Sequence, residues 1–436
     1  MDAGMTLIIV ALVFLVLMAC EVPIAFVLAL SGAVGIVLTR GWGVTTAAMG
    51  NTPFTAVANY SLSIVPMYVL VGVFAVFARI AEHVYTVADR LLYRVRGGLG
   101  VATIMACAGF AAVSGSSVAT AATIGRLSIT EMRKRGYPDT LAAALVAAAG
   151  TLGIMIPPSI ILAIYGILTR ISIADLLAAG ILPGVVEVLV YSAYIMIKGP
   201  GRRQRGTDAA ARPLRDLPWR GVVRVGIIFS LVMVGIYGGL FTVTESGALG
   251  ALFALVIMVI ELRPEGIKRV GAVVKAAFLE VAAVTSMSFF IFIGSSIFTF
   301  FLVSAGIPTA FVRWVSGLEM NPTLIVAVLL LVLIPLGMFL DSLSILVIFV
   351  PLTFPVVSAL GFNGIWYGIL VVCFIELGQI TPPVGINAYV VSGISGIPPE
   401  RVFRGVWPFT ILDILISAII FAFPGIVLFL PNLIGS

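Results

Sequence analysis

Charged residues are scarce in this chain, making up 10% of its 436 residues, against roughly a quarter in an average soluble protein. Histidine occurs once, and the three cysteines show neither a metal-site spacing nor a disulfide framework. These shortages exclude a soluble enzyme, a nucleic-acid-binding protein and a disordered chain. No Ser/His or paired-Asp arrangement is visible either, which argues against an intramembrane hydrolase. We therefore do not expect an enzyme.

Apolar residues are abundant instead, at 61% of the chain, and they occur in long runs. A membrane-crossing helix needs roughly 20 apolar residues. Runs of about this length or longer predict an all-α, multi-pass membrane protein with spans near 5–20, 22–39, 62–81, 138–169, 172–198, 222–241, 243–262, 277–304, 362–393 and 408–431.

Two further apolar regions, 98–131 and 323–360, are each interrupted by polar residues. The first contains Ser114-Gly115-Ser116-Ser117, and the second contains Asp341-Ser342. The apolar stretch 99–113 has only 15 residues, which is short for a span. We predict that both regions are re-entrant hairpins with polar tips. A complete two-span hairpin would return to the same side, so loop charge does not separate the two possibilities.

Basic residues indicate the orientation in the membrane. One assignment of the loops places 22 of the 25 lysines and arginines on the cytoplasmic side, leaving Arg40, Arg170 and Arg313 outside. This asymmetry follows the positive-inside rule and predicts that both termini lie outside the cytoplasm. The arginine-rich segment 198–224 then becomes a cytoplasmic linker between two halves.

The two halves carry similar sequence marks in the same order. Under the predicted orientation, the equivalent elements face opposite sides of the membrane, so we predict an inverted-topology repeat. The matched positions, 224 to 226 residues apart, are Glu21 and Glu245, Ser116 and Ser342, 153–158 and 378–383, and Pro183 and Pro408.

A proline pair interrupts one helical span in each half, at Pro157-Pro158 and at Pro382-Pro383. Proline cannot donate to the carbonyl four residues earlier, so both helices should break and free backbone carbonyls inside the membrane. Such oxygens suit a small hard cation such as sodium, and the hairpin tips supply further oxygens. A simple kink is the alternative. The half-helix after each break should favour an anionic substrate group, and Asn387 lies about one turn along the second half-helix.

Carboxylates inside apolar stretches are functional candidates by default. Asp341 is the strongest because it lies at a hairpin tip, and Glu376 precedes the second break by five residues. Glu187 and Asp413 each follow one of the matched prolines, which favours structural hydrogen bonds over proton transfer.

The residues at these positions resemble the large membrane subunit of TRAP (tripartite ATP-independent periplasmic) transporters, the DctM-like family. The resemblance covers essentially the whole chain, and no motif departs from it. Its motifs are Ser114–Gly125, Met132 with Gly136-Tyr137, Ile156–Ile160, Ala179–Gly184, Gly337–Asp341 and Ile380–Asn387.

The resemblance implies an elevator transporter that imports organic anions with sodium as the coupling ion and without a cofactor. It implies a small four-helix membrane subunit (Q), a periplasmic substrate-binding protein (P) and a bacterial inner-membrane location with periplasmic termini. The implied sodium-binding residues are Ser114, Gly115, Ser116, Ser117, Gly153 and Ile154 in the first half, and Asp341, Ser342, Gly378, Gln379, Thr381 and Gly385 in the second. The implied substrate-binding residues are Ser116, Pro158, Ser159, Pro383 and Asn387.

The resemblance also suggests how the chain divides between a scaffold and a moving transport domain. The predicted scaffold comprises 1–81 and 171–304, the predicted transport domain comprises 82–170 and 305–395, and 396–436 forms an amphipathic segment and a last helix. Two other readings stay open, namely a proton-coupled or standalone anion transporter and, with less support, a channel. Two discrete polar sites rather than a continuous polar pore favour a transporter.

Overall fold

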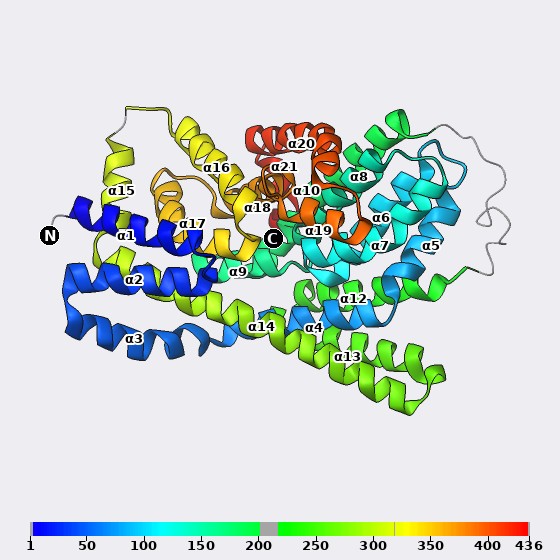
Figure 1. Cartoon of the computed structure of the whole chain (residues 1–436), viewed down its shortest axis with the longest axis horizontal. Coiled ribbons are helices and arrows are strands. Elements are labelled where there is room, and N and C mark those ends of the chain that lie inside the picture. Colours follow the sequence, from blue (N-terminus) through cyan, green and yellow to red (C-terminus); the bar gives the residue numbers. More distant parts are fainter. Residues whose placement is uncertain (1–2, 201–216, 318, 435–436) are drawn as a thin grey trace.

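The computed structural model describes residues 3–200, 217–317 and 319–434, and every regular element in these ranges is a helix (Figure 1). Within these ranges, eight helices are long and apolar enough to cross a membrane, and the count rises to nine if the bent pair α8–α9 is one span. The predicted all-α, multi-pass membrane architecture is therefore confirmed. Most of the predicted basic linker, residues 201–216, lies outside the described residues.

The N-terminal region contains two helices that the hydropathy pattern did not predict, Trp42–Val57 and Ile80–Leu92. Residues 42–57 are rich in glycine, threonine and alanine, yet they form a largely exposed helix that packs against α2 and α14. The elements here are α1 (Ala3–Ala19), α2 (Ile24–Arg40), α3 (Trp42–Val57), the 3₁₀ turn η1 (Tyr60–Ser63), α4 (Ile64–Phe77) and α5 (Ile80–Leu92).

A hairpin, a broken helix and a long helix follow, as the polar tip and the proline pair predict. They are α6 (Gly98–Ser114), α7 (Ser117–Lys134), α8 (Asp139–Met155), α9 (Ile160–Thr169) and α10 (Ile173–Lys198). The α8 and α9 axes are bent by 43° at the break.

The second half begins with a long helical frame and then repeats this order of elements. The frame is α12 (Trp219–Tyr237), α13 (Val243–Leu262), η3 (Arg263–Glu265), α14 (Ile267–Ser304) and α15 (Ile307–Ser316). The repeated series is α16 (Pro322–Phe339), α17 (Ser342–Ala359), α18 (Gly364–Ile380), α19 (Ile386–Ser395) and α20 (Pro399–Ala422), with α21 (Gly425–Ile434) after it.

Two predicted boundaries in this half are wrong. The span predicted at 277–304 begins ten residues earlier, at Ile267, and forms a 38-residue helix. The span predicted at 408–431 is two helices, because α20 begins at Pro399 and ends at Ala422, just before Pro424. Pro408 lies inside α20 rather than at its start.

Helix positions recur between the halves at nearly the same spacing as the sequence marks. The second hairpin helices start at Ser117 and Ser342, and the helices before the breaks start at Asp139 and Gly364, 225 positions apart in both cases. Each series also ends in a long helix with an internal proline, in α10 and in α20.

The broken helices α8 and α18 form the centre of this packing. Every residue from Ala142 to Met155 is buried, and so are the residues of α18 from Trp366 to Ile380 apart from Phe374. Small residues dominate α8, which allows α6, α7, α18 and α20 to approach its backbone. The long helix α14 runs obliquely past α2, α4 and α17 (Figure 1). The breaks and hairpin tips thus lie within the protein, where irregular backbone is tolerated in a membrane.

Candidate functional site

The first hairpin turns at Gly115, whose φ of 61° lies in the left-handed region that favours glycine. A Cβ at this position would also meet the Pro158 carbonyl oxygen, so the tip approaches the first break closely. Ser116 caps α7, with its Oγ accepting from the Ala119 N–H at 3.3 Å. Behind the tip, the Ser114 and Thr120 hydroxyls are 2.8 Å apart, and Thr120 Oγ1 also donates to the Ser116 carbonyl.

The second hairpin tip uses a carboxylate where the first uses a hydroxyl. Asp341 caps α17 and accepts from the backbone N–H groups of Leu343 at 3.1 Å and Ser344 at 3.2 Å. The Ser344 hydroxyl donates to its other oxygen. The Asp341 carboxylate is therefore fixed in place, with its negative charge at the positive end of α17.

At the first break, one of the two carbonyls predicted to be free has a new partner. The Ser159 hydroxyl donates to the Ile154 carbonyl at 2.6 Å and also accepts from the Leu162 N–H. The Gly153 carbonyl receives no such replacement from the part of the chain that is described. A Cβ at Gly153 would overlap the Ser116 carbonyl oxygen, so the first tip packs directly on this helix end.

At the second break, the first of the two carbonyls has gained a donor, whereas at the first break it is the second carbonyl that has. The Thr381 N–H donates to the Gly378 carbonyl at 3.2 Å, and the Thr381 hydroxyl donates to the Leu377 carbonyl at 2.5 Å. Within the described ranges, the Gln379 carbonyl gains no donor. Gly385, in the left-handed region with a φ of 52°, donates its N–H to the Met338 carbonyl near the second tip.

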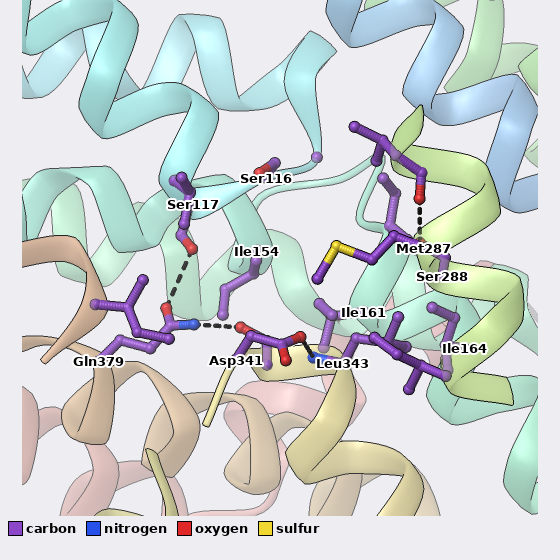
Figure 2. Close-up of a pocket in the computed structure, with 17 residues that line it drawn as sticks. Ser116, Ser117, Ile154, Ile161, Ile164, Met287, Ser288, Asp341, Leu343 and Gln379 are labelled. Atoms are coloured by element: carbon purple, nitrogen blue, oxygen red, sulfur yellow. Dashed lines mark hydrogen bonds between the residues drawn. The ribbon is translucent and has the colours of Figure 1, made fainter. Parts of the chain in front are cut away.

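The side chain of Gln379 connects the two hairpin tips. Its Oε1 accepts from the Ser117 hydroxyl at 3.1 Å, and its Nε2 donates to the Ser342 hydroxyl (Figure 2). The sequence prediction assigned the two tips to two separate sites and did not foresee this contact. Gln379 is 1% exposed, so its amide is held almost entirely by protein groups.

A cavity of about 200 Å³ lies between these tips and α14. Its polar wall is formed by residues of the tips and of the α18 end, and its other walls are apolar. Helix α14 closes one side with Val284, Met287, Ser288 and Ile291, and the Ser288 hydroxyl is bonded within its own helix (Figure 2). Among the described residues, no lysine or arginine lines this cavity.

The cavity gathers seven of the twelve predicted sodium-binding residues, namely Gly115, Ser116, Ser117, Ile154, Asp341, Ser342 and Gln379. The other five, Ser114, Gly153, Gly378, Thr381 and Gly385, do not form its wall. Of the five predicted substrate-binding residues, only Ser116 lines it, whereas Pro158, Ser159, Pro383 and Asn387 do not. Asn387 is fully buried, and neither atom of its amide has a partner among the described residues.

Three residues near the tips were missed by the sequence analysis. Thr120 lies one helical turn after Ser116, and Ser344 lies three residues after Asp341, so capping patterns could have revealed both. Met287 gave no signal, because it is an ordinary apolar residue of a long helix. The described tips offer hydroxyl, carboxylate and carbonyl oxygens as ligands, and no histidine, cysteine or carboxylate cluster of metal-binding geometry occurs in the described ranges. This donor set fits a hard monovalent cation.

The two carboxylates expected to make structural hydrogen bonds do so. Thr151 donates to Glu187 at 3.3 Å, and Tyr191 donates to Asp413 at 2.5 Å. Glu376 is also buried, and its Oε1 has no hydrogen-bond partner in the described part of the chain.

The described residues form eight long apolar helices, two hairpins and two broken helices around a cavity, and this arrangement defines a multi-pass membrane protein of the secondary-transporter class. The family model described as the tripartite ATP-independent periplasmic transporter, DctM component, matches residues 11–426. The chain belongs to this family.

Two relatives and one solved structure show how far the similarity extends. The chain is 34% identical over 413 residues to a C4-dicarboxylate TRAP transporter large permease protein of Pseudomonas aeruginosa, covering 94% of each chain. It is 29% identical over 423 residues to a sialic acid TRAP transporter large permease protein of Vibrio cholerae, covering 96% of each. The YdaH transporter of Alcanivorax borkumensis has a similar fold, with a TM-score of 0.62 and 15% identity over 89% of this chain and 90% of that one.

Proposed function

We propose that this chain is the large membrane subunit of a sodium-coupled importer of organic anions. The observation that carries the proposal is the set of oxygen atoms at the two tips and two breaks. It includes the fixed Asp341 carboxylate and two carbonyls, of Gly153 and Gln379, that prolines leave without donors. Hard cations such as sodium are bound by oxygen ligands of these kinds, and no histidine or lysine in the part of the chain that is described lines the cavity.

The proposed sodium ligands come from both halves. In the first half, Ser114–Ser117 would act with the break at Gly153 and Ile154. In the second half, Asp341 and Ser342 would act with the break between Gly378 and Gly385. The contact of Gly153 with the Ser116 carbonyl and the hydrogen bond from Gly385 to Met338 support this pairing of each break with its own tip.

The proposed substrate is a carboxylate-bearing anion held between the tips and α14. The N-terminus of α7 faces the cavity at Ser116–Val118, and its partial positive charge favours an anionic group. Related permeases are named for C4-dicarboxylates and for sialic acid, which also carry carboxylates. The family is tripartite, so we assign this chain a small four-helix membrane partner (Q) and a periplasmic binding protein (P) that delivers the substrate.

We further propose an elevator mechanism in an inverted repeat, in the bacterial inner membrane with both termini periplasmic. The recurring helix starts support the repeat, and the distribution of 22 against three basic residues supports the orientation. The division of the chain into scaffold and transport domain stays a prediction.

Uptake in proteoliposomes tests the coupling. The chain is reconstituted with both partner proteins, and uptake of labelled C4-dicarboxylate and of sialic acid is measured under an inward sodium gradient. We expect uptake of at least one of them, and little with potassium in place of sodium. Undiminished uptake in sodium-free buffer under a proton gradient would instead establish proton coupling.

A further inference from the structure

Gln379 is the only side chain in the described cavity wall that bonds to both hairpin tips. It belongs to α18, one residue before that helix ends, while Ser117 begins α7 and Ser342 begins α17. Ser117 donates to one end of the amide, and the other end donates to Ser342. The three residues form one connected chain of hydrogen bonds, which we call the amide bridge.

The amide bridge has no counterpart in the first half. Counting back 225 positions from Gln379 gives Ile154, whose apolar side chain lines the same cavity. The two serines, in contrast, are 225 positions apart and occupy the same place at the start of their helices. A single amide therefore joins two equivalent tips, and the described residues form no second link of this kind.

Burial makes the bridge sensitive to the loss of either serine. Gln379, Ser117 and Ser342 are all buried. A buried polar group that loses its partner destabilises the protein, because water does not replace the lost hydrogen bond. Removal of one serine hydroxyl leaves one end of the amide unpaired, so the amide must shift and its contact with the other tip must change. A disturbance at one tip thereby reaches the other.

We propose that Gln379 is a positioning residue that couples the two hairpin tips, so that the two sodium sites bind cooperatively rather than separately. The inference rests on the proposed sodium coupling and deepens it. The sequence alone favours two independent sites, because each proline break has its own tip. The amide bridge connects them across residues that are 262 positions apart in the chain.

A triple-mutant cycle tests the coupling. Ser117→Ala, Ser342→Ala and their double variant are prepared in the native background and in Gln379→Met, which keeps the side-chain length but cannot bridge. The readout is the sodium concentration at half-maximal thermal stabilisation of the purified chain, at constant ionic strength. In the native background, we expect the double variant to differ from the product of the single effects by about threefold or more. In the Gln379→Met background, the two effects should multiply to within about twofold.

Two further variants exclude a role that is only structural. Gln379→Glu keeps the oxygen that accepts from Ser117 and replaces the amide nitrogen with a second oxygen, to which the Ser342 hydroxyl can donate instead of accepting. It should therefore retain the coupling that Gln379→Met loses. Ser128 is a buried serine on α7 whose hydroxyl has no partner in the described chain, so Ser128→Ala should combine independently with Ser342→Ala in both backgrounds.

The outcomes separate this inference from the proposed function. Multiplicative effects of Ser117→Ala and Ser342→Ala in a native background that responds to sodium overturn the amide bridge and leave sodium binding intact. A native chain whose stability is the same in sodium and potassium overturns the proposed sodium coupling, and the inference with it. Coupling in the native and Gln379→Glu backgrounds that disappears in Gln379→Met supports both.

Discussion

The two halves of the molecule place equivalent helices around the cavity, but the polar groups at their tips and breaks differ. The first tip is capped by the Ser116 hydroxyl through one backbone N–H, whereas Asp341 caps the second through two. At the breaks, Ser159 satisfies a carbonyl in the first half, and Gln379 supplies an amide only in the second. The two halves thus have similar backbones, but the first half carries neutral oxygens where the second half carries a carboxylate and an amide. We infer that the second half contributes more of the cation affinity.

The largest expected effect is at the carboxylate of the second tip. Asp341→Asn keeps a capping side chain but removes the charge, so sodium half-saturation should rise by about tenfold or more, because a charged partner contributes about 1.5–3 kcal/mol. Asp341→Ala should in addition lose about 1 kcal/mol of stability through the lost cap. Sodium titration of thermal unfolding measures both.

Asp139→Asn is the matched control for this charge removal, because Asp139 starts α8 and pairs with Arg133 on an exposed surface. It should leave sodium half-saturation unchanged. An equal shift in Asp139→Asn and Asp341→Asn would mean that the net charge, rather than the tip, sets the affinity.

Gly153 tests how closely the first tip packs on its break. A Cβ there would overlap the Ser116 carbonyl, so Gly153→Ala should destabilise the chain by about 1–3 kcal/mol. Gly393 lies inside α19 with open space around it, and Gly393→Ala should be neutral or slightly stabilising. Thermal unfolding of the two variants gives the comparison, and equal stability would show that the tip does not rest on Gly153.

Replacing each proline pair with alanine compares the contributions of the two breaks to sodium affinity. Replacing Pro382 and Pro383 with alanine restores a donor for the Gln379 carbonyl, the one that the second break leaves without a donor among the described residues. Sodium half-saturation should therefore rise by roughly threefold to tenfold, from a hydrogen bond of about 1 kcal/mol. Replacing Pro157 and Pro158 likewise restores one donor, for the Gly153 carbonyl, since Ser159 already bonds the Ile154 carbonyl, so we expect an effect of similar size. Assembly with the small subunit should survive in both. Unchanged sodium affinity in either variant would mean that the break is only a packing kink and does not bind the ion.

The last prediction compares the stability lost when the residues that satisfy carbonyls at the two breaks are replaced. Ser159→Ala removes both the bond to Ile154 and the cap of α9, so it should cost about 1–2 kcal/mol of stability. Thr381→Val removes only a hydroxyl that bonds within its own helix and should cost less. Thermal unfolding in potassium, without sodium, isolates these losses, and the reverse order would contradict the assigned partners.

Local signals in the sequence predicted the hairpins and breaks. Serine and aspartate caps and proline pairs act on neighbouring backbone groups, so their consequences can be read from a few residues. The helix α3 could not be read this way, because its composition is mixed and its packing against α2 and α14 stabilises it. The start of α14 at Ile267 was missed for a related reason, since its first residues are partly charged.

The cavity and the amide bridge depend on long-range packing. Ser117 and Gln379 are 262 positions apart, and no local pattern indicates that their side chains meet. The contribution of α14 to the cavity is equally invisible in the sequence, because Met287 and Val284 look like any lipid-facing apolar residues. The sequence therefore predicted four carbonyls without helical donors, but not that the Ser159 hydroxyl and the Thr381 N–H bond two of them.

Hydrogen exchange at the two tips tests most directly the claim that unlike tips form one sodium-binding unit. The native chain is titrated with sodium, and with potassium at equal ionic strength, while exchange is followed in peptides covering 115–118 and 341–344. We predict that sodium protects both peptides with the same midpoint and that potassium protects neither. Protection of one tip alone, or equal protection by potassium, would contradict the account.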